Sequence, residues 1–230
     1  MQAVIFNAID HQRIVELPAW QRWKRGLRAL VEVGKDPDRT DKVLEAYEHL
    51  NAGTERSRVR RFYSSPDAQR LFAEDRTLDK TTLDVTALAK LPEGTLGQGY
   101  ARFMTERGLT PDIFASQGVL TREAFMIKRL RQTHDLWHVL TGINTDVPGE
   151  LELQAFSTVQ LRLPSAFLLV FLGTLRWLWR HPTIPFRVLR GTIAGLRARR
   201  LEAVPWEDFW ATPLTELRAR LLKRKGDWAI

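Results

Sequence analysis

The chain has 230 residues, 44% of them hydrophobic, which is enough apolar material to bury a sizeable core. It contains no cysteine, so disulfide bonds, thiolate metal ligands and cysteine nucleophiles are excluded, and any metal site must be built from His, Asp or Glu. The formal net charge is +8. No Ser- or Gly-rich linker divides the chain, and we expect a single domain over residues 1–230.

Helical periodicity runs through nearly the whole chain, whereas alternating strand patterns are scarce. This predicts an all-α fold, a single-domain helical bundle. Capping residues and prolines give the helix starts. The expected helices cover 17–32, 40–50, a segment from 65, a long segment from 121 that carries His134 and His138 near its end, 151–161, 165–180, 185–201 and 213–224.

The strongest chemical pattern is His134-Asp135-Leu136-Trp137-His138. A helix advances about 100° per residue, so the two histidines and Asp135 fall in one sector of about 100°. Two imidazoles and carboxylates suit a divalent ion, with Zn²⁺ favoured and Fe²⁺ or Mn²⁺ as alternatives. For the histidine pair alone, a buried polar patch in which Asp135 pairs with Arg131 is the favoured reading.

A turn after this helix supplies a further carboxylate and shifts the balance toward metal binding. Gly142 can end one helix, while Pro148 and Gly149 can begin the next. The chain then reverses, and Glu150 in the first turn of the new helix returns toward the histidines. The expected metal ligands are therefore His134, Asp135, His138 and Glu150, with Asp135 alternatively orienting a histidine through a hydrogen bond.

Positive charge is concentrated in one segment. Between Leu153 and Leu201 there are eight arginines and no acidic residue, and the rest of the chain is balanced, so this segment carries the whole formal +8. Its uncharged run, 163–175, is too short to span a bilayer. Aromatic and arginine-rich amphipathic helices are typical of membrane surfaces with anionic lipids. The expected contact residues are Phe167, Phe171, Trp177, Trp179, Arg187, Arg190 and Arg197.

Two other interpretations of this segment are open. The apolar run can be a buried core helix with the arginines on a solvated face, and a combination of core and lipid surface fits the pattern best. Nucleic-acid binding ranks last, because the basic residues lie among Leu, Trp and Phe and no nucleic-acid-binding motif is present.

Three sequence blocks resemble, in the same order, the ubiquinone (coenzyme Q) biosynthesis family that forms the fourth component of the coenzyme Q synthesis complex in the yeast numbering. HDLWHVLTGINTDVPGELELQAF contains the family signature HDxxH-x11-E, with Glu150 at the matching distance from His138. Residues 91–104 resemble its LPxGTLGxxYxxFM segment, and residues 206–218 resemble its C-terminal motif. The resemblance covers about 91–218.

The resemblance implies a prenylated 4-hydroxybenzoate-type precursor of ubiquinone, which loses its C1 carboxylate by simple or oxidative decarboxylation. This is lyase chemistry of the 4-hydroxy-3-methoxy-5-polyprenylbenzoate decarboxylase type. A metal would act as a Lewis acid, and Arg131 would help to hold the substrate carboxylate. An apolar groove beside the metal would take the polyprenyl tail.

The expected location is cytoplasmic and bacterial, peripheral on the inner face of the cytoplasmic membrane, because the first ten residues resemble neither a signal nor a transit peptide. The expected partners are other ubiquinone biosynthesis proteins, anionic lipids and a second copy of the chain. A non-catalytic lipid-binding scaffold that organises the ubiquinone enzymes is the alternative function. A metal-dependent hydrolase is a weaker third, since His11, His49 and His181 are not followed by Asp.

Overall fold

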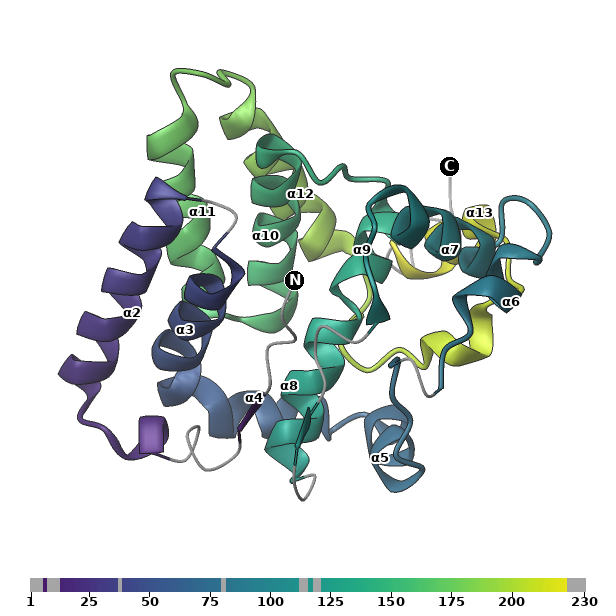
Figure 1. Cartoon of the computed structure of the whole chain (residues 1–230), viewed down its shortest axis with the longest axis horizontal. Helices are drawn as coiled ribbons and strands as arrows, with labels where there is room; N and C mark the ends of the chain where they lie inside the picture. Colours follow the sequence, from purple (N-terminus) through teal and green to yellow (C-terminus); the bar gives the residue numbers. More distant parts are fainter. Residues whose placement is uncertain are drawn as a thin grey trace. The chain divides into compact units, whose positions relative to one another are not determined.

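The computed structural model describes residues 6–7, 13–36, 39–79, 82–111, 116–117 and 121–222. Its regular structure is almost entirely helical (Figure 1), which confirms the all-α class. The two strands, β1 (Phe6–Asn7) and β2 (Ser116–Gln117), have two residues each. The helices are α2 (Ala19–Lys35), α3 (Thr40–Asn51), η1 (Ala52–Thr54), α4 (Glu55–Phe62), α5 (Pro66–Ala73), α6 (Val85–Ala89), α7 (Leu96–Glu106), α8 (Arg122–Gln132), α9 (His134–Thr141), α10 (Val147–Leu161), α11 (Pro164–Trp177), α12 (Ile184–Arg197), η3 (Trp206–Phe209) and α13 (Leu214–Leu221).

The described residues group into two compact units, each built from separate stretches of the chain. One unit contains residues from 61–144 and from 197 onward, and the other contains residues from 6–60 and 145–196. The single domain over residues 1–230 stays a prediction.

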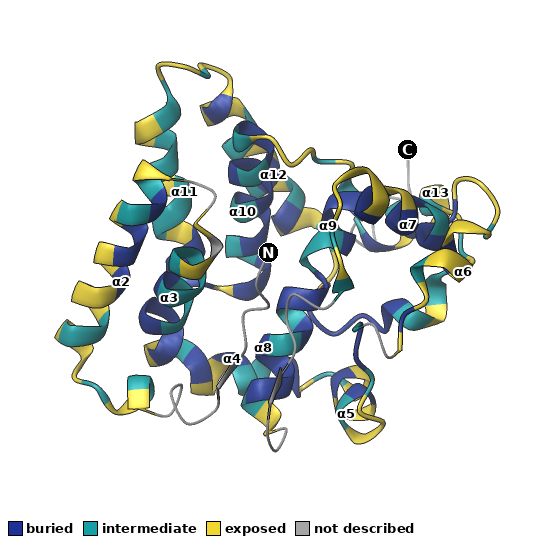
Figure 2. Cartoon of the chain, in the orientation of Figure 1, coloured by how far each residue is buried: buried dark blue, intermediate teal, exposed yellow. Residues whose placement is uncertain are grey.

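The first unit is organised around α8 and α9, on which buried residues gather (Figure 2). Helices α7 and α13 both pack against α9. Arg129 on α8 is only 1% exposed, and its guanidinium donates to both carboxylate oxygens of Glu207, at 2.5 and 2.7 Å, and to the Val204 carbonyl at 3.1 Å. Such a two-pronged ion pair fixes orientation as well as distance, so it holds the segment around η3 against α8.

The long helix expected from residue 121 is wrong, because the structure has two helices there. Thr121 caps α8, its hydroxyl oxygen accepting the Ala124 N–H, and α8 ends at Gln132. Thr133 is fully buried between α8 and α9, and its hydroxyl donates to the Leu130 carbonyl at 3.4 Å. A hydroxyl that hydrogen-bonds to the preceding turn competes with regular helix geometry. Both histidines therefore lie on the short helix α9.

The remaining expected helices exist with shifted ends. Helix α10 begins four residues before the expected start at Leu151, because the Asp146 side chain accepts the Gly149 N–H at 2.8 Å and Pro148 occupies the first turn. Helix α11 ends at Trp177 and α12 ends at Arg197, both before the expected ends. Helices α4, α6 and α7 were not expected.

In the second unit, α2 packs against α3, and α11 packs against α2, α3 and α10. Helix α12 approaches α10 through two glycines. A Cβ at Gly191 would lie 2.2 Å from the Glu152 carbonyl oxygen, and one at Gly195 would lie 2.8 Å from that of Phe156. The Gln160 amide also donates to the Gly195 carbonyl at 2.7 Å. Only glycine permits this closeness of the two backbones.

Gly191→Ala is therefore expected to destabilise the fold by about 1–3 kcal/mol, the usual cost of forcing extra atoms into a packed contact. Gly34 on α2 is the matched control, because a Cβ there meets nothing within 4 Å. Gly34→Ala is expected to be neutral or to stabilise by up to about 1 kcal/mol through helix propensity. Urea denaturation measures both, and equal midpoints for the two variants would contradict the close contact.

Candidate metal centre

Helix α9 presents its two histidines one turn apart. Their ring centroids lie 5.0 Å apart, and the ring planes are nearly perpendicular. His138 is 2% exposed and His134 is partly buried. The expectation that the i, i+4 spacing places both imidazoles on one side of a helix is confirmed.

The predicted end of one helix and start of the next follow the histidines directly. Gly142 has φ 73° and ψ 15°, the left-handed conformation that favours glycine, and its N–H donates to the His138 carbonyl at 2.8 Å. Asp146 then caps α10, which places Glu150 in the first turn of that helix, as expected.

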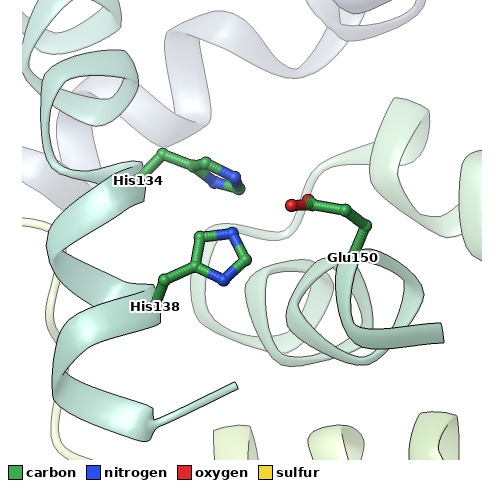
Figure 3. A group of neighbouring side chains, drawn as sticks. All are labelled: His134, His138 and Glu150. Atoms are coloured by element: carbon green, nitrogen blue, oxygen red, sulfur yellow. The ribbon is translucent and has the colours of Figure 1, made fainter. Parts of the chain in front are cut away.

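His134, His138 and Glu150 each offer one ligand atom, and these atoms all lie within 4.8 Å of one another. Figure 3 shows the two imidazoles and the carboxylate pointing toward one another. Ligand atoms about 2.0–2.2 Å from one tetrahedral ion lie about 3.3–3.6 Å apart, so modest side-chain adjustment would complete such a site. Two imidazoles and one carboxylate are a donor set of catalytic zinc sites and of non-haem iron(II) sites, and the residues present fit a divalent ion.

Asp135, the fourth expected ligand, is not in this group. Its charge acts on Tyr100 of α7 instead: burial raises the pKa of the Tyr100 hydroxyl, and the nearby Asp135 carboxylate raises it further. Tyr100 is 2% exposed, and its hydroxyl keeps its proton to a higher pH than an ordinary tyrosine does. A direct bond from Asp135 to a metal stays a prediction.

The surroundings of His138 fix the orientation of its ring. Nδ1 lies 2.9 Å from the Ile143 carbonyl oxygen, which accepts a hydrogen bond from it in the Nδ1–H tautomer and so assigns Nε2 to metal binding. Phe103 of α7 stacks on the imidazole, with ring centroids 5.6 Å apart and planes inclined by 22°. The guanidinium of Arg107 lies 4.0 Å from the Phe103 ring centroid. The ring is thus held at one edge by the turn and on one face by α7.

Arg218 of α13 supports α9 from its C-terminal end. Its guanidinium donates to the Leu140 carbonyl at 2.8 Å and to the Val139 carbonyl at 3.2 Å. These carbonyls have no partner inside a helix that ends at Thr141, so a cation placed there satisfies them and complements the helix dipole. The sequence did not predict this contact, although Arg218 is the last residue of the C-terminal block at 206–218.

The two distant sequence blocks pair with each other through their backbones. Leu96 N–H donates to the Thr212 carbonyl at 3.0 Å, and Gly97 N–H donates to the Trp210 carbonyl at 2.8 Å. A Cβ at Gly97 would lie 3.0 Å from that same Trp210 oxygen. The block that carries Phe103 and the block that carries Arg218 therefore form one support beside α9.

The other expected site residues are one buried arginine and a set of aromatic residues that are mostly exposed. Arg131 lies on α8 and is 9% exposed, and its contact with a substrate carboxylate stays a prediction. Phe167, Phe171 and Trp179 are exposed, whereas Trp177 is partly buried with Arg180 over its ring.

Two of the three arginines expected at the membrane surface have carboxylate partners. Arg190 donates to both oxygens of the buried Glu152, at 2.6 and 2.7 Å, and Arg187 donates to Asp146 at 3.4 Å. Asp146 and Glu152 precede the segment 153–201, so the excess of positive charge within that segment does not take account of them. Arg197 is exposed. In the described part of the chain, no helix has the length and apolarity to cross a bilayer.

Comparison with known proteins gives consistent matches. A sequence model described as coenzyme Q (ubiquinone) biosynthesis protein Coq4 matches residues 11–224. The zebrafish (Danio rerio) mitochondrial ubiquinone biosynthesis protein COQ4 homolog is 32% identical over 212 residues, which cover 84% of this chain and 75% of the relative. The rat (Rattus norvegicus) homolog is 32% identical over 160 residues, which cover 68% of this chain and 60% of the relative. The chain thus spans between 60% and 75% of the length of these two curated relatives.

A solved structure also matches. It is the crystal structure of a protein from Nostoc punctiforme PCC 73102 that was provisionally assigned to ubiquinone biosynthesis. Its sequence identity is 29% and its TM-score is 0.71, with 86% of this chain and 97% of that chain covered.

Removing one imidazole is expected to abolish stoichiometric metal binding, because two remaining ligands are too few for tight binding. His134→Ala and His138→Ala should both lose the metal, Glu150→Gln should weaken binding less, and His181→Ala is the histidine control outside the group. Metal analysis of protein purified without chelators or affinity metals measures the content, and circular dichroism monitors folding. A folded His134→Ala protein that keeps its full metal content would contradict the assignment.

Arg218→Ala is expected to weaken metal affinity about 10–100-fold, the usual effect of a residue that orients a metal ligand without touching the metal. The visible spectrum of the Co²⁺-substituted protein should also change, because the coordination geometry around the ion loosens. Arg218→Lys should recover part of the affinity, since an ammonium group can still donate to one carbonyl. An Arg218→Ala protein with unaltered affinity and spectrum would refute this role.

Proposed function

Because the chain belongs to the Coq4 family of coenzyme Q (ubiquinone) biosynthesis proteins, we propose that it is a metal-dependent enzyme that removes the C1 carboxylate of a prenylated 4-hydroxybenzoate-type precursor. The observation that carries this proposal is the group His134, His138 and Glu150. Three protein ligands leave coordination positions for substrate or water, whereas structural zinc sites are usually closed by four protein ligands.

A divalent ion bound there supplies Lewis-acid stabilisation of the charge on the substrate oxygens as CO₂ leaves. The chain's own residues hold the site in shape. The Ile143 carbonyl keeps the proton on His138 Nδ1, and Phe103 covers one face of that imidazole. Glu150 contributes a negative charge that offsets part of the charge of the ion.

The proposal includes two chemical routes. In simple decarboxylation, the electron pair of the broken bond stays on C1, which then takes a proton. In oxidative decarboxylation, O₂ and a two-electron reductant are consumed, one oxygen atom becomes the new C1 hydroxyl and the other leaves as water. Two histidines and one carboxylate suit both Zn²⁺ and Fe²⁺, but only iron can activate oxygen by redox change. The metal therefore decides between the routes.

The substrate's polyprenyl tail places the reaction at a membrane surface. Phe167, Phe171 and Trp179, exposed on or just after α11, support this location. The protein would lie on the inner face of the cytoplasmic membrane, with anionic lipids, other ubiquinone biosynthesis proteins and a second copy of the chain as partners. We also propose that an apolar groove beside the metal group holds the polyprenyl tail.

The competing function is a scaffold that binds the lipid precursor and presents it to other enzymes, with a metal that only stabilises the fold. Both functions use the same apolar surface. They differ at the open coordination positions, which a scaffold does not need.

The assay uses a prenylated 4-hydroxybenzoate-type acid labelled at the carboxyl carbon. Protein loaded separately with Zn²⁺, Fe²⁺ or Mn²⁺ is tested with and without oxygen, with a chemical reductant in the aerobic samples. Labelled CO₂ is expected from wild type and His181→Ala but not from His134→Ala or metal-free protein. Mass spectrometry separates the hydrogen-substituted product from the hydroxylated one. Lipid binding without labelled CO₂ for all three ions would reject catalysis and leave the scaffold.

A further inference from the structure

Exposed large apolar side chains are concentrated in one unit of the protein. In the described ranges, all those that are more than about one third exposed lie on α2, on α12, or on or just after α11. They are Trp20, Trp23, Leu27, Val31, Phe167, Phe171, Leu172, Leu175, Trp179, Phe186, Leu189, Ile193 and Leu196. The four on α2 lie far in sequence from the arginine-rich segment and form a separate apolar surface.

Helix α2 is anchored through one face. Its buried residues Ala29 and Leu30 join Ala46 and Leu50 of α3 in one core cluster. Gly26 allows the closest approach, because a Cβ there would lie 2.4 Å from Leu50. This face accounts for the packing of α2 in its unit.

A second apolar stripe runs along α2 beside the buried face. Trp20, Trp23, Leu27 and Val31 are 65%, 44%, 40% and 54% exposed. At about 100° per residue, these four positions fall within about 80° of the helix circumference. The buried face already secures the helix, so the fold does not require this stripe. Such a row of large exposed side chains marks an interaction surface.

Basic residues flank the stripe on its other side. Lys24, Arg28 and Lys35 lie about 40–80° around the helix from Trp20 and are exposed, and Arg25 follows further round. The one acidic residue of α2, Glu32, pairs with Lys35 at 2.8 Å. Helix α2 thus shows three adjacent sectors: a buried face, an exposed apolar stripe and a basic flank.

Helix α12 repeats this arrangement. Phe186, Leu189, Ile193 and Leu196 share a sector of about 80°, with Arg197 next to it. Two copies of the chain that met through such faces would bring like charges together, which opposes association. Anionic lipid headgroups instead complement the basic flank, and tryptophan rings favour the headgroup level. Charge therefore selects a lipid surface over a second copy as the occupant.

We propose that α2 is a membrane-docking helix that lies in the plane of an anionic bilayer, with Trp20, Trp23, Leu27 and Val31 toward the acyl chains and Lys24, Arg28 and Lys35 at the phosphates. The inference extends the membrane-surface part of the proposed function. It does not depend on the metal or on decarboxylation.

The chain's lack of cysteine makes a direct test possible. Leu27→Cys and Gln21→Cys place a single environment-sensitive NBD dye in the stripe or about 120° away from it on the same helix. With vesicles of phosphatidylglycerol and phosphatidylcholine, the dye at 27 should shift to the blue and brighten, and the dye at 21 should change little. Pure phosphatidylcholine should give a weaker response, and added salt should release part of the protein.

A second measurement uses flotation of unlabelled protein. The double variant Trp20→Gln, Trp23→Gln should partition into the anionic vesicles about tenfold less or weaker still, because it loses two apolar contacts with the bilayer. Both side chains are exposed, so the fold should be unaffected. Wild-type metal content in this variant serves as the control that the rest of the protein is intact.

The outcomes separate the hypotheses. Wild-type flotation with a silent dye at 27 would overturn the role of α2 and leave the membrane proposal standing. Absence of flotation would overturn both. A dye response at 27 that needs no vesicles and grows with protein concentration would identify a second copy of the chain as the occupant and overturn the lipid assignment.

Discussion

The turn from Gly142 to Asp146 is the constraint on which the candidate metal centre depends. It uses a left-handed glycine to end α9 and a capping aspartate to begin α10. An L-residue at the glycine would cost about 1–2 kcal/mol in backbone energy, and without the cap the first N–H groups of α10 would lose a partner. The turn also supplies the Ile143 carbonyl that fixes the His138 tautomer. One five-residue segment therefore joins the helix that carries His134 and His138 to the helix that carries Glu150.

The two sequence blocks far from the histidines, 91–104 and 206–218, together support α9. Their backbones hydrogen-bond to each other at Leu96 and Gly97, and from this joint support Phe103 reaches the His138 ring and Arg218 reaches the end of α9. A short helix such as α9 is marginal by itself and draws its stability from tertiary packing. The blocks provide that packing, which gives a structural reason for finding them together with the histidine motif.

Local signals in the sequence predicted more of the fold than long-range ones could. Proline and capping residues located most helices, and Gly142 and Pro148 located the reversal, because these effects act within a few residues. The break at Thr133 was missed because it depends on burial of that side chain. Arg218 was missed because its acceptors are backbone carbonyls, which look alike in every sequence. On α2, the sequence shows apolar residues around more than half of the helix, but only packing reveals which of them α3 and α11 cover.

Charge pairing across the fold is also hard to predict from the sequence, and the two glutamates of α10 are an example. Glu150 and Glu152 lie about 200° apart around the helix, so one carboxylate faces the histidines and the other faces Arg190 of α12. Glu152 is buried, and loss of its arginine would leave an uncompensated charge in the interior, which is strongly destabilising. Arg190 therefore contributes to the stability of the fold through its pairing with Glu152, and this role does not require a membrane surface. Because Gly191 and Gly195 allow α12 to pack against the α10 backbone, the helix that carries the candidate ligand Glu150 lies directly against a helix with an exposed apolar stripe. Helix α10 thus carries Glu150 of the candidate metal group and also forms the packing surface for α12.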